Sequence, residues 1–116
     1  MRPAAMDQSP HARFTAACRE GRLDYQWDPR AGRAVFHPRV GDHLVWRTSA
    51  GLGTVYATTV LRRRDDDPAN LALIDLDEGF RMMSRVEGVA PEDVAIGMRV
   101  RVRFDEDPVP VFEPAP

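Results

Sequence analysis

The stretch MRVRVRF, residues 98–104, alternates apolar and charged side chains without a break. Successive side chains of a β-strand point to opposite faces, so this period of two separates an apolar face from a charged one. The apolar face carries Met98, Val100, Val102 and Phe104, and the charged face carries Arg99, Arg101 and Arg103. The stretch therefore predicts a half-buried strand, and such a strand needs neighbours to complete its backbone hydrogen bonds.

Strand patterns continue on both sides of this stretch. Turn-forming residues separate them, and they fall at 44–49, 54–61, 71–76, 80–86 and 109–114. The segment 90–97, which has a proline near its start, is typical of one helical turn. About five short antiparallel strands in a small domain are typical of a partly open Greek-key barrel of the OB type. The predicted fold class is therefore mainly β, with a five-stranded OB-fold barrel.

The N-terminal third has a different pattern. Ser9 and Pro10 are typical of a helix start, and Gly21 marks the end of a short helix. Alternation resumes over 23–27, and DPRAG (28–32) predicts a turn before a second short strand. The predicted domains are the helix with its hairpin and the OB-fold barrel, at residues 1–43 and 44–116.

Composition limits the function classes. The chain has 116 residues, 16 basic residues that are all arginine, and 18 acidic residues, for a net charge of −2. This balance argues against a nucleic-acid partner, and the absence of lysine removes Schiff-base chemistry. No apolar run is long enough for a membrane span, and the N-terminus lacks the apolar segment of a signal peptide. With Cys18 as the single cysteine, these features predict a cytoplasmic protein without an internal disulfide.

No catalytic constellation stands out in the sequence. Cys18 lies near the C-terminal end of the predicted helix, where the helix dipole raises the pKa of a thiol. Ser49, Thr54 and Ser84 have no histidine placed beside them by a known motif, and phosphate-binding and dinucleotide fingerprints are absent. The acidic residues of 75–78 flank a turn, where such residues are common. We therefore predict that the chain has no catalytic residues and is not an enzyme by itself.

Six side chains are candidate metal ligands, namely His11, His37, His43, Asp28, Asp42 and Cys18. A structural zinc site needs four nitrogen or sulfur ligands, often in close pairs. Such pairs are missing here, because His37 and His43 are separated by turn residues and the chain has one cysteine. The sequence therefore predicts no metal site and no cofactor.

The arginine stripe of 99–103 has two interpretations. Three guanidinium groups on one face could bind the phosphates of a CoA thioester or the acidic face of a partner. Alternatively, the stripe is the solvated outer face of a half-buried strand, with its charge balanced by the acidic residues of 105–107. The second interpretation is favoured. The candidate phosphate-binding residues are Arg99, Arg101 and Arg103, with Arg81 and Arg85 as further candidates.

Three segments resemble one known family, in order and at similar spacing. They are GLGTVYATTV (51–60), LIDLDEGFRMMSRVEG (73–88) and PEDVAIGMRVRVRF (91–104). Over residues 14–114 the chain resembles the acyl-CoA-associated proteins known as domain of unknown function thirty-five. Members of that family combine an N-terminal helix, a rubredoxin-like zinc ribbon and a C-terminal OB fold, so the resemblance implies the same order of parts here.

The resemblance breaks down at the zinc ribbon. The family ribbon carries a Cys-x-x-Cys-Gly knuckle before an FPPR-like segment, and then a second Cys-x-x-Cys. Gly32 and FHPR (36–39) match, but Asp28 and Ala31 stand at the first two cysteine positions, and only VGDH (40–43) remains of the second knuckle. A Cys₄ zinc site therefore cannot form. We expect a degenerate, metal-free ribbon hairpin, packed through Tyr25, Trp27, Val35, Phe36 and Trp46.

Family members are usually non-catalytic subunits that accompany thiolase-like and other acyl-CoA enzymes. The resemblance implies an accessory or scaffold subunit that helps to form or order the acyl-CoA site. Aromatic side chains often anchor interfaces, and the predicted partner-binding residues are Phe14, Tyr25, Trp27, Phe36 and Trp46. The alternatives are a stand-alone OB-fold binder of CoA thioesters and a binder of single-stranded nucleic acid. Without a partner, a homodimer is a further alternative.

Overall fold

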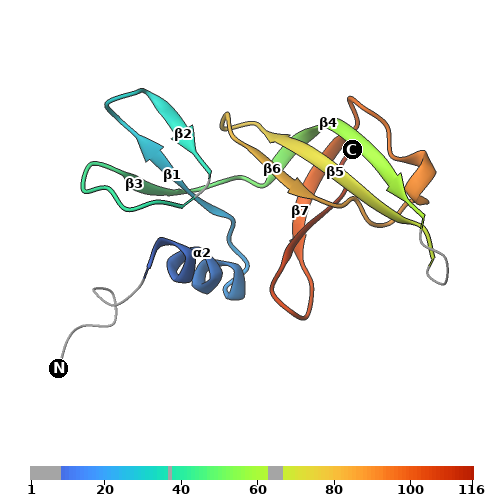
Figure 1. Ribbon diagram of the computed structural model, residues 1–116, viewed down its shortest axis with the longest axis horizontal. Coiled ribbons are helices and arrows are strands. Elements are labelled where there is room, and N and C mark those ends of the chain that lie inside the picture. The colour runs from blue at the N-terminus through green and yellow to red at the C-terminus, as the bar shows by residue number, and fades with distance from the viewer. Residues whose placement is uncertain (1–8, 37, 63–66) are drawn as a thin grey trace.

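A computed structural model describes residues 9–36, 38–62 and 67–116 (Figure 1). The described residues form one helix and then eight strands, with a 3₁₀ turn before the seventh strand. In order, the elements are α2 (Pro10–Arg19), β1 (Asp24–Asp28), β2 (Arg33–Val35), β3 (Val45–Thr48), β4 (Leu52–Leu61), β5 (Ala69–Leu76), β6 (Arg81–Ser84), η1 (Pro91–Asp93), β7 (Arg99–Phe104) and β8 (Pro110–Pro114). No helix of the described residues is long and apolar enough to cross a membrane.

The strands form two antiparallel sheets, which confirms the predicted mainly β fold class. The smaller sheet has the order β2-β1-β3, and the larger has the order β6-β5-β4-β7-β8 (Figure 1). The strict alternation of 98–104 places β7 in the larger sheet, between β4 and β8. There Val100 is fully buried and the three arginines are exposed, as the period of two predicts.

The larger sheet is OB-like, but its ladder is not closed into a full barrel. Its two edge strands meet at one parallel bridge between Val86, just after β6, and Phe112 in β8. The backbone N–H of Phe112 donates to the carbonyl of Arg85 at 3.0 Å, and the N–H of Glu87 donates to the carbonyl of Phe112 at 2.7 Å. Closure by so few hydrogen bonds explains why the predicted barrel is present as an open, curved sheet.

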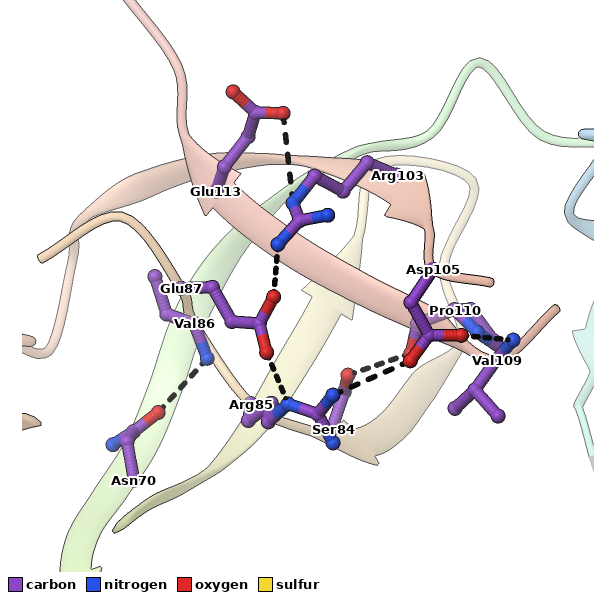
Figure 2. Close-up of polar contacts among 10 residues, drawn as sticks. All are labelled: Asn70, Ser84, Arg85, Val86, Glu87, Arg103, Asp105, Val109, Pro110 and Glu113. Atoms are coloured by element: carbon purple, nitrogen blue, oxygen red, sulfur yellow. Dashed lines mark hydrogen bonds and ion pairs between the residues drawn. The ribbon is translucent and has the colours of Figure 1, made fainter. Parts of the chain in front are cut away.

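Side-chain hydrogen bonds also hold the end of β6 in place near this bridge, as Figure 2 shows. The buried Asn70 accepts a hydrogen bond from the backbone N–H of Val86 at 2.9 Å, and the Ser84 hydroxyl donates to the carbonyl of Pro110 at 3.0 Å. Both contacts join the end of β6 to its surroundings in β5 and β8. They provide hydrogen-bond partners for backbone polar groups that the single bridge does not pair.

Strand β3 does not belong to the larger sheet. The sequence pattern at 44–49 was expected to contribute to the OB-fold domain, but β3 pairs with β1, with Trp46 opposite Gln26. The reason is chain connectivity, because strands that are close in sequence usually lie side by side. The two sheets share one hydrophobic core. The division of the chain into two domains at residues 43 and 44 stays a prediction.

The short helix begins as its sequence predicts. The Ser9 hydroxyl accepts a hydrogen bond from the N–H of Ala12 at 3.1 Å, and Pro10 occupies the first helical position. After the helix, Gly21 has a φ of 78°, a left-handed conformation that glycine adopts without steric cost. Ala17 and Cys18 are the buried residues of α2, and the half-buried Phe14 packs against the core one turn earlier.

A column of aromatic rings joins the two sheets. Phe80, just before β6, stacks on Tyr25 of β1 with ring centroids 4.8 Å apart and on Phe36 with centroids 5.2 Å apart. Phe14 of α2 meets the edge of Phe36 at 5.6 Å. Phe80 and Tyr25 are each 5% exposed, and both belong to the common core. The orientation of the N-terminal unit therefore depends on Phe80, a residue of the C-terminal part.

Hydrogen bonds also hold the chain segment that connects the two sheets. The Glu78 carboxylate accepts the Ser49 hydroxyl at 2.7 Å and the backbone N–H of Ala50 at 2.8 Å. The Ser49 oxygen in turn accepts the N–H of Gly51 at 2.9 Å. The chain segment that leaves β3 is thus held by the turn after β5.

Replacing Phe80 with alanine should lower the free energy of unfolding by about 3–5 kcal/mol, because it leaves a cavity between two stacked rings. Urea unfolding followed by tryptophan fluorescence measures this change, with Met83→Ala as the control. Met83 is 64% exposed, so its truncation should change the free energy by less than about 0.5 kcal/mol. Equal effects of the two substitutions would contradict the role given to the column.

Candidate functional site

The turn between β1 and β2 is organised by Asp28. Its side-chain carboxylate accepts the backbone N–H groups of Arg30 at 3.0 Å and Ala31 at 3.2 Å, and its carbonyl accepts the N–H of Gly32 at 2.8 Å. Gly32 has a φ of 66°, which suits glycine at this point of the turn. Burial acts to raise the pKa of Asp28, but the two backbone N–H bonds, with the nearby His43 and the Arg39 guanidinium, outweigh it, so the pKa is lowered.

Hydrogen bonds from a buried side chain, Gln26, hold the segment that follows β2. The Gln26 side-chain amide donates to the carbonyl of Arg39 at 2.8 Å and accepts its N–H at 2.9 Å. Gln26 is buried, and the Arg39 guanidinium and the His43 ring lie 3.7 Å and 3.6 Å from the Asp28 carboxylate. The hairpin is thus held by side-chain amide and carboxylate groups as well as by aromatic packing.

The sequence predicted packing of the hairpin through aromatic and apolar side chains and did not predict these hydrogen bonds. The signal was present, since Asp24, Gln26 and Asp28 recur with a period of two in β1. Such a pattern normally predicts a solvent-facing side of a strand. Here all three are buried, because helix α2 and the segment after β2 cover that side of the sheet.

The residues described hold no group of three or more His, Cys, Asp or Glu side chains that could bind a metal ion. His37, one of the six candidate ligands, lies outside the described residues. Cys18 is buried, and burial, with a smaller contribution from Asp24, raises the pKa of its thiol to about 11. At neutral pH this thiol is protonated, so it suits packing better than nucleophilic attack or metal binding.

The metal-free character of the hairpin stays a prediction. Purified protein, expressed in zinc-supplemented medium, should contain well below one zinc per chain by elemental analysis, because Asp28 and Ala31 replace thiolate ligands. A variant with Asp28→Cys and Ala31→Cys serves as the comparison, since it restores one ligand pair. Stoichiometric zinc in the natural protein would contradict the prediction.

A buried carboxylate, Asp24, ties the helix to the smaller sheet. It is 2% exposed, and it accepts a hydrogen bond from Arg13 of α2 at 2.9 Å and one from Thr48 of β3 at 2.7 Å. Arg22 lies 3.6 Å from the same carboxylate. Burial acts to raise the pKa of Asp24, but the bonds from Thr48 and Arg13 and the nearby cations outweigh it, so the pKa is lowered.

Asp24→Asn should lower the free energy of unfolding at pH 7 by about 2 kcal/mol, because it weakens charge-assisted hydrogen bonds. A lowered folded-state pKa stabilises the fold above the unfolded-state pKa, and this contribution is lost as the pH falls through the folded value. The difference between wild type and variant should therefore shrink below about pH 4, the ordinary range of an aspartate. Chemical unfolding at pH 7 and pH 3 tests this, with the exposed Asp42→Asn as control. A difference that stays constant with pH would contradict it.

The structure brings together three of the five predicted partner-binding aromatics. Phe14, Tyr25 and Phe36 meet in the column around Phe80, and Tyr25 is too deeply buried to contact a partner. Trp27 and Trp46 are half-buried on opposite faces of the smaller sheet. The Arg47 guanidinium lies 4.3 Å from the Trp27 ring centroid, and that of Arg13 lies 4.9 Å from the centroid of Trp46. The two tryptophans are therefore the members best placed for contact.

The arginine stripe of β7 is engaged with acidic side chains. Arg99 makes two hydrogen bonds of 2.8 Å to Asp77. The other two arginines pair with glutamates, Arg101 with Glu113 and Arg103 with Glu87 and Glu113. Figure 2 shows Arg103 and Glu87 in this arrangement. The charge balance expected from 105–107 comes instead from acids on neighbouring strands and turns, and the phosphate-binding role of the stripe stays a prediction.

A family model described as the C-terminal OB-fold domain of ChsH2 matches residues 46–105, which is more than half of the chain. The chain belongs to this OB-fold family. The match starts within β3 and covers β4 to β7, the strands that build most of the larger sheet.

A solved structure entitled Ltp2-ChsH2(DUF35) aldolase is similar over 99% of this chain and 100% of that chain, with 28% sequence identity and a TM-score of 0.78. DUF35 is the abbreviation of domain of unknown function thirty-five, so the family resemblance is confirmed. Because the likeness covers nearly the whole chain, it includes the helix and the smaller sheet as well as the OB-fold part.

Two curated relatives are similar over part of their length. A probable enoyl-CoA hydratase alpha subunit of Thermomonospora curvata is 38% identical over 80 residues, covering 60% of this chain and 25% of the relative. The 3-oxo-4,17-pregnadiene-20-carboxyl-CoA hydratase alpha subunit of Mycobacterium tuberculosis is 38% identical over 64 residues, covering 52% and 21%. The matched region thus spans about a quarter or less of these relatives.

Proposed function

We propose that this chain is an accessory subunit of an enzyme complex that processes acyl-CoA thioesters. The observation that carries the proposal is the full-length likeness to a chain of the Ltp2-ChsH2(DUF35) aldolase, at a TM-score of 0.78. The two curated relatives, which are named as alpha subunits of CoA-thioester hydratases, support the same substrate class. The finer part of the proposal is that the partner enzyme is thiolase-like and that the subunit helps to order its acyl-CoA site.

We propose further that the chain itself supplies no catalytic group. Three observations within the described residues support this role. The Cys18 thiol is buried with a raised pKa, the Ser49 hydroxyl is bonded to Glu78, and the arginines of β7 are paired with carboxylates. Groups that are buried or already bonded are poorly placed to act on a substrate.

The proposed contact surface lies on the N-terminal unit, through the five aromatics named above. Tyr25 is buried, and Phe14, Trp27 and Phe36 are half-buried and pack against the core, so these four also hold the unit in shape. Trp27 and Trp46 are half-buried, and an arginine guanidinium lies over each of the two rings. Tryptophan and arginine are common at the centres of interfaces.

Co-expression with acyl-CoA enzymes encoded beside this gene tests the proposal. A thiolase-like enzyme, or another acyl-CoA enzyme, should co-elute with the chain at a fixed stoichiometry, and its specific activity or melting temperature should rise. No complex and no change in any neighbouring enzyme would contradict the proposal. Calorimetry of the chain alone with acetyl-CoA and a long-chain acyl-CoA is the companion experiment. It should give flat titrations, whereas tight binding would favour the stand-alone binder.

A further inference from the structure

The arginines of the larger sheet are neutralised within the molecule. Each arginine on strands β6 and β7, and Arg85 just after β6, forms an ion pair with a carboxylate of the same part of the chain. The pairs are Arg81–Asp75, Arg85–Glu87, Arg85–Asp105, Arg99–Asp77, Arg101–Glu113, Arg103–Glu87 and Arg103–Glu113. Residues 51–116 contain 13 acidic residues and 8 arginines. This part of the surface is therefore acidic overall.

The smaller sheet has the opposite balance. Residues 9–50 contain 7 arginines and 4 acidic residues, and two of those acids, Asp24 and Asp28, are buried. Arg30, Arg33 and Arg47 are exposed, and none of them pairs with a carboxylate in the part of the chain that the structure describes. Positive charge on this sheet is therefore not neutralised as it is on the larger one.

These arginines surround apolar side chains that are also exposed. The turn of 29–32 and the segment of 38–44 lie at the end of the smaller sheet that points away from the larger sheet (Figure 1). Val40 is 86% exposed and Val45 is 48% exposed. We call residues 27–34 and 39–47 the distal end of the smaller sheet. It combines half-buried tryptophan, exposed valine and unneutralised arginine.

We propose that the distal end of the smaller sheet is a docking surface for an acidic patch on a partner protein. This inference rests on the proposed function and names the chemistry of the partner's face. Trp27, Val45 and Arg47 share one face of the smaller sheet, and tryptophan and arginine are the residue types that contribute most to binding energy in protein interfaces. Charge of one sign at the rim speeds association with a partner of opposite sign.

The charge distribution favours a protein over a nucleic acid as the partner. A nucleic acid is a long polyanion, and beyond the distal end it would meet the acidic surface of residues 51–116. A compact acidic patch avoids this repulsion. A second copy of the chain is disfavoured because many acids of the larger sheet are already engaged by its own arginines.

The test uses the complex of this chain with its acyl-CoA enzyme, formed as in the co-expression experiment. The variant is Arg30→Glu with Arg33→Glu, and Arg30→Glu alone serves as a milder variant because a glutamate at 33 would face Asp28 across the sheet. The control is Arg19→Glu, which makes the same kind of charge change at an exposed position on α2, outside the distal end.

At about 50 mM salt the double variant should associate with the enzyme about tenfold more slowly, and the single variant about threefold more slowly, as expected for reversed rim charges. The difference should shrink at about 500 mM salt because the charges are screened. Arg19→Glu should associate at the wild-type rate. Circular dichroism melting confirms that the variants fold.

Three outcomes would overturn the inference. Unchanged association of the double variant with a complex that still forms would reject the docking surface and leave the proposed function intact. Absence of any complex with wild type would reject both. A dimer at low salt that the double variant abolishes, or binding of an oligothymidylate probe that it abolishes, would assign the surface to a second copy or to nucleic acid instead.

Discussion

The ring of Phe80 determines how the two halves of the molecule are joined. It lies just before β6 in the larger sheet, yet it stacks with two rings of the N-terminal unit, Tyr25 and Phe36. Stacked aromatic pairs prefer a defined geometry, so this column fixes direction as well as burying apolar area. Glu78, two residues earlier, clamps the connection between the sheets at Ser49. Neither sheet could reorient without breaking one of these contacts.

The smaller sheet shows how short strands can be held together by side-chain hydrogen bonds. Asp28 accepts two backbone N–H groups of the turn, and Gln26 makes a paired hydrogen bond with the backbone of Arg39. A buried carboxylate is tolerated only where hydrogen bonds and cations compensate its lost hydration, and Asp24 meets that condition through Arg13 and Thr48. Side-chain hydrogen bonds here hold together short strands that would be marginal on their own.

The two parts of the chain also differ in how their charged side chains are paired. In the larger sheet arginines and carboxylates neutralise one another, which keeps an exposed strand face soluble while contributing little stability for each pair. In the smaller sheet the acids are turned inward and the arginines outward. The inward acids stabilise the sheet through their hydrogen bonds, whereas exposed arginines without carboxylate partners repel one another and are consistent with a surface for association.

The sequence alone determined the fold class, the strict alternation of 98–104, the capped start of α2 and the family, because local periodicity and short motifs report on these directly. It also named the aromatics that pack in the N-terminal unit. Only the tertiary structure decided that β3 pairs with β1, that Tyr25 is buried against Phe80, and that Asp24, Gln26 and Asp28 face inward. Each of these depends on which distant segment covers a given face, and a period of two cannot distinguish a polar face open to water from one covered by a helix carrying the matching hydrogen-bond donors.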